Sequence, residues 1–169
     1  MGDDYPRFSE PELNRRRAAI LEVMANHDLD GVLVFGANRS GSAIQWLSEW
    51  PVTREASLVI TPGETDALWV QFYNHVPNAR RLARRCTVSW DGPQTWRAAA
   101  EALRARGVRR LGLIGPLGWK GHAALSDGFE IVSLDAEYTQ LRLVKSEEEL
   151  EWMRRGAELS DRAIEAVRD

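Results

Sequence analysis

Short apolar runs alternate with longer amphipathic stretches along the chain. Residues 32–35 (VLVF) and 111–114 (LGLI) contain no charged side chain, as in strands that are buried on both faces. Elsewhere apolar residues recur at spacings of three and four, which is typical of helices with one buried face. The pattern predicts strands at 32–35, 58–61, 66–71, 87–90, 111–114 and 130–134, and helices at 10–27, 42–48, 75–83, 93–106 and 119–125.

Strands that alternate with helices predict an α/β domain built in layers. Pro62-Gly63 lies between two predicted strands and favours a hairpin there. A hairpin places one antiparallel strand among parallel ones, so we expect a mixed, mostly parallel sheet flanked by helices. Residues 136–143 receive no element of their own and lead from the last strand to a terminal helix.

The terminal helix carries the clearest local signals in the chain. Ser146 and Glu149 have the Ser-x-x-Glu spacing of a capping box, and acidic residues fill the first turn. The apolar residues that follow recur on one face, which must pack on something; they are Leu150, Met153, Ala157, Ile164 and Val167. No stop signal follows them. Either this helix folds back on its own domain or the chain is a fragment, and we favour the fragment.

The first helix has a similar start. Ser9 and Glu12 form a second capping box, and Pro11 suits a first helical turn. Its apolar stripe is predicted to comprise Leu13, Arg17, Ile20, Leu21 and Met24, flanked by arginine stems. Residues 1–9 are predicted to be a flexible N-terminus.

Composition excludes several function classes. The 169 residues carry a formal net charge of −3, too small to indicate a nucleic-acid or membrane partner. Two arginine clusters, at 80–85 and 104–110, lack the interleaved aromatic residues of a nucleic-acid site and are interpreted as solvated helix faces. With no basic and apolar leader and no apolar run of about 20 residues, the expected location is the cytoplasm.

The chain contains few residues that could serve in catalysis or in metal or cofactor binding. Cys86 is the only cysteine, so neither an intrachain disulfide nor a multi-cysteine metal site can form, and its expected role is that of a small apolar residue entering a strand. The glycines at 112, 115, 118 and 121 match neither phosphate-binding pattern and are interpreted as turn and packing positions. The three histidines lie in different elements and are interpreted as ordinary residues. We therefore predict no catalytic residue, metal ligand or cofactor site in this chain.

The junction before the terminal helix carries a family resemblance. The order Arg142, Lys145, Ser146, Glu149, Leu150, Met153, Arg154 and Ala157 is similar to the segment that joins the two domains of creatinase, prolidase and aminopeptidase P proteins. Upstream features agree in order: the arginines 15–17, the strand around 29–34, Trp46-Leu47 where the family often has Tyr-Leu-Thr-Gly, and the strands at 58–63 and 67–70. The resemblance covers nearly the whole chain.

The resemblance implies both a fold and an activity for the longer protein. The fold would be the three-layer N-terminal domain of this family, with a ribonuclease H-like topology. The implied division is 1–9 as flexible N-terminus, 10–143 as the N-terminal domain, and 144–169 as linker and first helix of a truncated C-terminal catalytic domain. Family enzymes hydrolyse peptide bonds, often next to proline, with two divalent metal ions such as manganese, cobalt or zinc. Their Asp, Asp, His, Glu and Glu ligands all lie beyond this chain, and creatinase-like members work without metal.

The same resemblance implies that this domain supports a homodimer and contributes loops to the rim of an active site. The loop candidates are Asn38 and Arg39 after the first strand, and Trp50 and Arg54 before the hairpin. A guanidinium can pair with a substrate carboxylate through two hydrogen bonds, which makes Arg54 the preferred candidate. The plainer interpretation of Arg54 is a solvated loop charge, and that of Trp46 is a core residue.

Two other functions remain open. One is a free-standing α/β module that binds a small ligand at the carboxyl ends of its strands. The other is a histone-chaperone-type pseudo-peptidase domain, which should show a more strongly charged face. A reading frame that continues into metal-ligand motifs would favour the peptidase.

Overall fold

A single six-stranded sheet forms the centre of the molecule in the computed structural model, which describes residues 7–37, 40 and 42–168. The strands are β1 (Gly31–Ala37), β2 (Glu55–Ile60), β3 (Asp66–Val70), β4 (Cys86–Trp90), β5 (Arg110–Ile114) and β6 (Glu130–Ser133), in the spatial order β4-β3-β2-β1-β5-β6. The β1–β2 and β2–β3 pairs are antiparallel and the other pairs are parallel. Only β2 is reversed, so the predicted mixed, mostly parallel sheet is confirmed.

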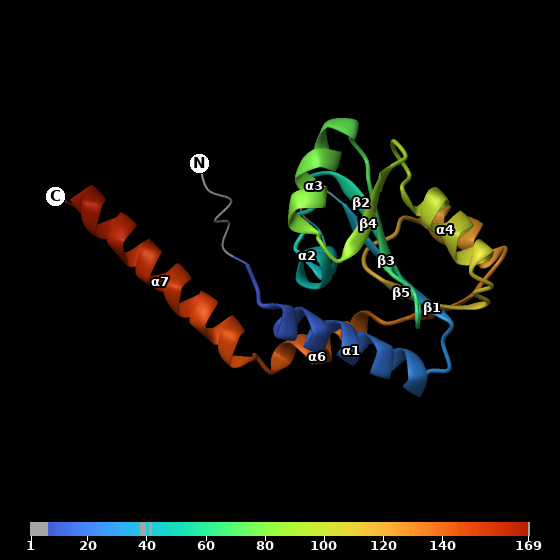
Figure 1. The fold of residues 1–169 in the computed structure, drawn as a ribbon, viewed down its shortest axis with the longest axis horizontal. Helices are drawn as coiled ribbons and strands as arrows, with labels where there is room; N and C mark the ends of the chain where they lie inside the picture. Colours follow the sequence, from blue (N-terminus) through green and yellow to red (C-terminus); the bar gives the residue numbers. More distant parts are fainter. Residues whose placement is uncertain (1–6, 38–39, 41, 169) are drawn as a thin grey trace.

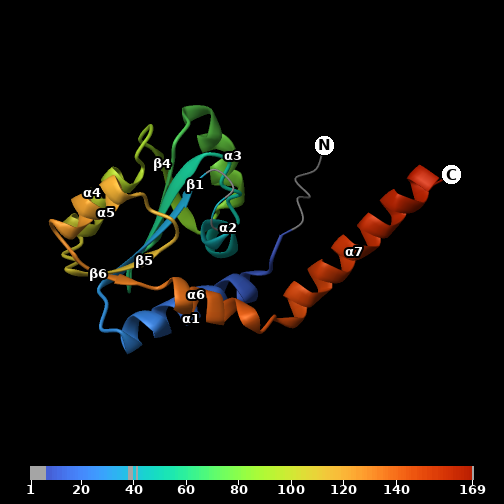
Figure 2. The same ribbon diagram turned by 180° about the vertical axis from the view of Figure 1, so that it is seen from behind.

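Helices cover both faces of the sheet (Figures 1 and 2). Within the described residues they are α1 (Glu10–Asn26), α2 (Ala43–Ser48), α3 (Val76–Leu82), α4 (Trp96–Ala105), α5 (Trp119–Ser126), α6 (Asp135–Leu143) and α7 (Glu147–Arg168), with a 3-10 turn at Tyr73–His75. One apolar cluster joins α1, α2, α3 and α6 to the sheet, and a second joins α4 and α5 to its other face. Helices, sheet and helices make the three predicted layers.

The hairpin and the buried strands were the most predictable elements. Residues 32–34 of β1 are fully buried, as expected for a central strand that is covered on both faces. The sequence missed α6, because only Tyr138 and Leu141 of that helix pack against the core and so give too few points to define a period. It also began α4 three residues early, since Gln94 has a φ of 66°, which is incompatible with a helix.

The ends of the helices agree only in part with the capping signals in the sequence. Ser9 Oγ accepts a hydrogen bond from the Glu12 amide at 3.3 Å, but the Glu12 carboxylate binds arginines rather than returning to Ser9. The predicted box at Ser146 and Glu149 is reciprocal, with distances of 3.0 and 3.1 Å. Gly107, at φ 75°, follows the end of α4 as predicted.

Helix α7 extends away from the body of the domain (Figures 1 and 2). Its first turn contacts the domain through Glu149, which is 9% exposed, whereas every described residue from 153 onward is exposed. These include the apolar side chains of Met153, Ile164 and Val167, at 58%, 65% and 88% exposed. Among the described helices, none is both long and apolar enough to cross a membrane.

Candidate functional site

A buried ionic cluster joins the start of α7 to the domain. Arg16, only 1% exposed, donates from Nε to Glu12 Oε1 at 2.7 Å and from Nη2 to Glu149 Oε1 at 3.1 Å. Its Nη1 donates to the carbonyl oxygen of Trp46 at 2.9 Å. The guanidinium also lies over the Phe8 ring, 3.8 Å from its centroid. We call Glu12, Arg16, Trp46 and Glu149 the junction cluster.

Glu149 is where three elements meet. Its Oε1 also accepts from the indole Nε1 of Trp46 at 2.8 Å, so one oxygen is bound by α1 and α2 together. Its Oε2 accepts from the Ser146 amide at 3.0 Å and lies 3.6 Å from Arg15 Nη2. A side chain that caps its own helix is thereby fixed to two others, which sets the direction in which α7 leaves the domain.

Both carboxylates of the cluster are held ionised. Burial opposes ionisation of Glu12, but hydrogen bonds from Arg15 and Arg16 outweigh it and lower its pKa to about 2. Burial likewise opposes ionisation of Glu149, and hydrogen bonds from the Ser146 amide and Trp46, with the charge of Arg16, lower its pKa. Removing any one member would leave an incompletely compensated charge in a buried place.

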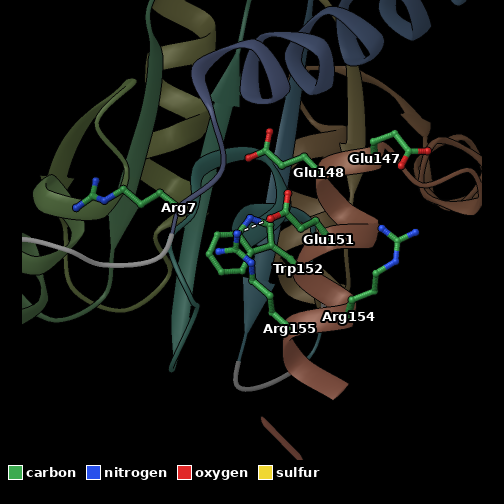
Figure 3. Close-up of a pocket in the computed structure, with 7 residues that line it drawn as sticks. All are labelled: Arg7, Glu147, Glu148, Glu151, Trp152, Arg154 and Arg155. Atoms are coloured by element: carbon green, nitrogen blue, oxygen red, sulfur yellow. Dashed lines mark hydrogen bonds and ion pairs between the residues drawn. The ribbon is translucent and has the colours of Figure 1, made fainter. Parts of the chain in front are cut away.

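Beside the cluster, an open groove of about 570 Å³ runs along the first turns of α7 (Figure 3). Ser9 donates from its amide and hydroxyl to Glu148, both at 2.6 Å, and Phe8 meets Trp152 edge to face at 6.3 Å. The groove is lined by three arginines, three glutamates and a tryptophan, which are Arg7, Glu147, Glu148, Glu151, Trp152, Arg154 and Arg155. Charges of both signs and no enclosed apolar floor describe a helix–segment contact better than a ligand pocket.

The residues predicted to lie at the rim of an active site differ in their exposure. Arg54 is exposed immediately before β2 and makes no hydrogen bond or ion pair with another described residue. Trp50 is not available to a substrate: it is 3% exposed and packs in the core, with its ring 5.7 Å from that of His75. Asn38 and Arg39 lie outside the described residues. Because Ala37 pairs with Glu55, β1 ends and β2 begins at the same edge of the sheet.

No described group of residues resembles a metal site. Among residues 7–37, 40 and 42–168, no three His, Cys, Asp or Glu side chains converge to hold an ion. Burial raises the pKa of the Cys86 thiol to about 12, with a smaller contribution from Asp66. The neighbouring arginines therefore do not activate the thiol, and Cys86 serves as a packing residue as predicted.

The sequence matches the family model of the creatinase/prolidase N-terminal domain over residues 16–144. The chain belongs to this family. No curated protein matches the sequence. The family match begins at Arg16 and ends just before α7, so the junction cluster ties a creatinase/prolidase N-terminal domain to the helix that follows it.

Solved structures of peptidases share the fold of this creatinase/prolidase N-terminal domain. An Xaa-Pro dipeptidase from Bacillus anthracis is 16% identical at a TM-score of 0.73, covering 92% of this chain and 42% of the enzyme. The prolidase from Pyrococcus horikoshii is 21% identical at 0.70, covering 90% and 42%. The N-terminal domain of the cytoplasmic peptidase PepQ from Mycobacterium tuberculosis is 19% identical at 0.65, covering 76% of this chain and 98% of that domain. The chain thus spans less than half the length of the first two enzymes.

Sequence reasoning missed the junction cluster of this domain. It placed Arg17 in the buried stripe of the first helix, whereas Arg16 is buried and Arg17 is only partly buried, bound to Asp66 at 3.0 Å. A signal was present, because Arg16 follows Leu13 by three residues and precedes Ile20 by four. Its partners Trp46 and Glu149 are 30 and 133 positions away, beyond the reach of local patterns.

Proposed function

We propose that this chain is the non-catalytic N-terminal domain of a metal-dependent Xaa-Pro dipeptidase or aminopeptidase. The observation that carries the proposal is α7: its first turn is fixed to the domain by a buried ionic cluster, while its apolar face is exposed. An exposed apolar face of this length is normally covered by protein. A catalytic domain that follows the helix would cover it.

The share of this chain that each solved structure covers supports the proposed division into an N-terminal domain and the start of a catalytic domain. The two longer peptidases cover 92% and 90% of this chain, whereas the isolated N-terminal domain covers only 76%. Such a difference is expected if the longer enzymes have a counterpart for a part of this chain that a separate N-terminal domain lacks. The extent of that part suits residues 144–169, the proposed linker and first helix of a catalytic domain.

The metal chemistry is proposed for the longer protein alone. The longer protein would hold two divalent ions, manganese, cobalt or zinc, which would supply Lewis-acid chemistry for peptide-bond hydrolysis. The described residues of this chain do not fit such a pair, since no three potential ligands converge. The domain's contribution is therefore structural and, at its rim, toward the substrate.

A homodimer and a rim role complete the proposal. Arg54 suits the rim because its guanidinium is exposed at a sheet edge and has no ion-pair partner among the described residues. It would bind a carboxylate of a substrate held by a neighbouring catalytic domain. A cytoplasmic location agrees with the description of one neighbour as a cytoplasmic peptidase.

Comparison of this chain with the protein encoded by the complete reading frame tests the proposal. We expect the 169-residue chain to release no proline from Xaa-Pro dipeptides or longer peptides with manganese, cobalt or zinc. We expect the reading frame to continue into Asp, His and Glu metal ligands, and its product to hydrolyse these substrates with metal. Turnover that co-purifies with the short chain, or a reading frame that stops at Asp169, would overturn the assignment.

A further inference from the structure

The strands β1 and β5 are parallel neighbours, and the helices that follow them lie on opposite faces of the sheet. The helix after β1, α2, packs with the cluster on one face, and the helix after β5, α5, packs with the cluster on the other. When adjacent parallel strands send their helices to opposite faces, a crevice opens beyond their carboxyl ends. Ligands of α/β proteins bind preferentially in such crevices.

A cavity of about 700 Å³ occupies this position on the α4–α5 side. Phe35 near the end of β1 and Leu117 after β5 contribute apolar side chains, and Trp96 and Trp119 come from the starts of α4 and α5. Its volume falls in the range of small-molecule sites, which combine an apolar lining with a few polar groups. Trp119 is 82% exposed beside it, so one indole face is free to stack on a planar group.

The charged groups of the cavity favour an anion. Arg97 and Lys120 both line it and are exposed, and neither forms an ion pair within the described residues. The one carboxylate in the lining, Glu55, already accepts hydrogen bonds from the amide and the hydroxyl of Thr95. The cavity therefore presents two cations with no carboxylate paired to them.

The aromatic and cationic groups adjoin each other. The Arg97 guanidinium lies 5.4 Å from the Trp96 ring, an arrangement that leaves its N–H edge available to a carboxylate. Lys120 directly follows Trp119 in the first turn of α5, where the helix dipole adds to the positive potential. Apolar walls and cations thus meet in one cavity.

We infer that this cavity binds a small ligand that carries a carboxylate on a planar apolar body. The planar group stacks against the exposed indole of Trp119, the largely buried Trp96 ring forms part of the wall, and the carboxylate binds Arg97 and Lys120. The site requires no catalytic domain, because every residue named lies within this chain. It therefore stands or falls independently of the proposed peptidase.

Phenylacetate is a suitable probe, titrated into the full 169-residue chain by isothermal calorimetry and by NMR of the tryptophan indole N–H groups. We expect saturable binding in the millimolar range or tighter, as is usual for a ligand of about ten heavy atoms, with shifts at two indoles. Phenylacetamide, which keeps the ring and loses the charge, and acetate, which keeps the charge and loses the ring, should each bind at least tenfold more weakly.

Variants localise the binding. Arg97→Gln with Lys120→Gln should weaken phenylacetate binding at least tenfold, and Trp119→Ala at least threefold. Arg104→Gln is the matched control, since Arg104 is also an exposed α4 residue that stacks on an aromatic ring, 5.1 Å from the centroid of Phe129. It should bind as the parent does. Absence of saturable binding, equal binding of phenylacetamide, or full affinity in the double variant would overturn the inference.

Discussion

At the scale of single residues, Arg16 is bound more completely than any nearby charge. It has two carboxylate partners, one carbonyl partner and an aromatic ring against its face, and it is 1% exposed. A buried arginine is tolerable only when its charge is compensated and its nitrogens find acceptors, and here each of the three guanidinium nitrogens has one. The cost of losing one partner should therefore exceed that of losing any exposed ion pair.

Glu12→Gln tests the cost of losing one partner of Arg16, at the carboxylate whose pKa is displaced most clearly. A carboxylate with a folded pKa of about 2, below its ordinary 4.5, adds stability above pH 4.5 that is lost as pH falls toward 2. At pH 7 we expect the variant to be less stable by about 2–3 kcal/mol, from urea unfolding. The difference from the parent chain should shrink progressively between pH 4.5 and pH 2.

Glu158→Gln, an exposed glutamate on α7, is the matched control and should change stability by no more than about 0.5 kcal/mol at any pH. A Glu12→Gln deficit that persists unchanged at pH 2 would mean that packing, rather than the ionised carboxylate, accounts for it.

At the scale of elements, local sequence signals predicted which helices form better than they predicted what those helices contact. The capping box of α7 and its amphipathic pattern were both visible in the sequence, and the helix begins where they indicate. The partners of its first turn were not visible, because α1 and α2 lie more than 100 positions earlier. The short helix α6 was missed for a related reason, since its buried contacts come from only two partly buried apolar side chains, Tyr138 and Leu141.

Two truncations separate the anchored start of α7 from its exposed remainder. Removing residues 158–169 deletes only exposed or undescribed residues, so the free energy of unfolding should change by within about 0.5 kcal/mol. Removing residues 147–169 also removes Glu149, leaves Arg16 with one carboxylate, and should cost about 3 kcal/mol. Urea unfolding followed by far-UV circular dichroism measures both.

Equal losses in the two truncated chains would show that the junction cluster does not anchor the helix. A large loss in the shorter deletion would show instead that the exposed part of α7 packs on its own domain in solution.

At the scale of the whole molecule, the sheet architecture followed from the order of short apolar runs and one Pro-Gly turn. The position of β2 between β1 and β3, and the reversal of that strand alone, required only that hairpin and compact connections. The candidate site was less predictable: Trp50 stood in a polar loop and proved to be core, because its side chain is 3% exposed and belongs to the apolar cluster on the α1–α2–α3 face of the sheet. Loop polarity indicates where a chain turns, but not which of its side chains the fold covers.

A substitution of Arg54 tests whether the exposed edge of the sheet contacts a substrate. In the protein encoded by the complete reading frame, Arg54→Ala should raise KM for an Xaa-Pro substrate more than it lowers thermal stability. One charge-assisted contact to the substrate is worth about 1.5–3 kcal/mol, or roughly ten- to a hundredfold in kcat/KM. The exposed Arg54 makes no ion pair with other described residues, so its loss should leave stability within about 0.5 kcal/mol.

Arg109→Ala is the matched control, because Arg109 is also exposed but precedes β5, at the amino end of the parallel strands and so at the opposite edge of the sheet. Its kinetics should equal those of the parent enzyme. If the Arg54 variant also hydrolyses its substrate with unchanged kcat and KM, then Arg54 is a solvated loop charge. Of the proposed roles, support of a homodimer and attachment of the proposed catalytic domain through α7 and the junction cluster would then remain.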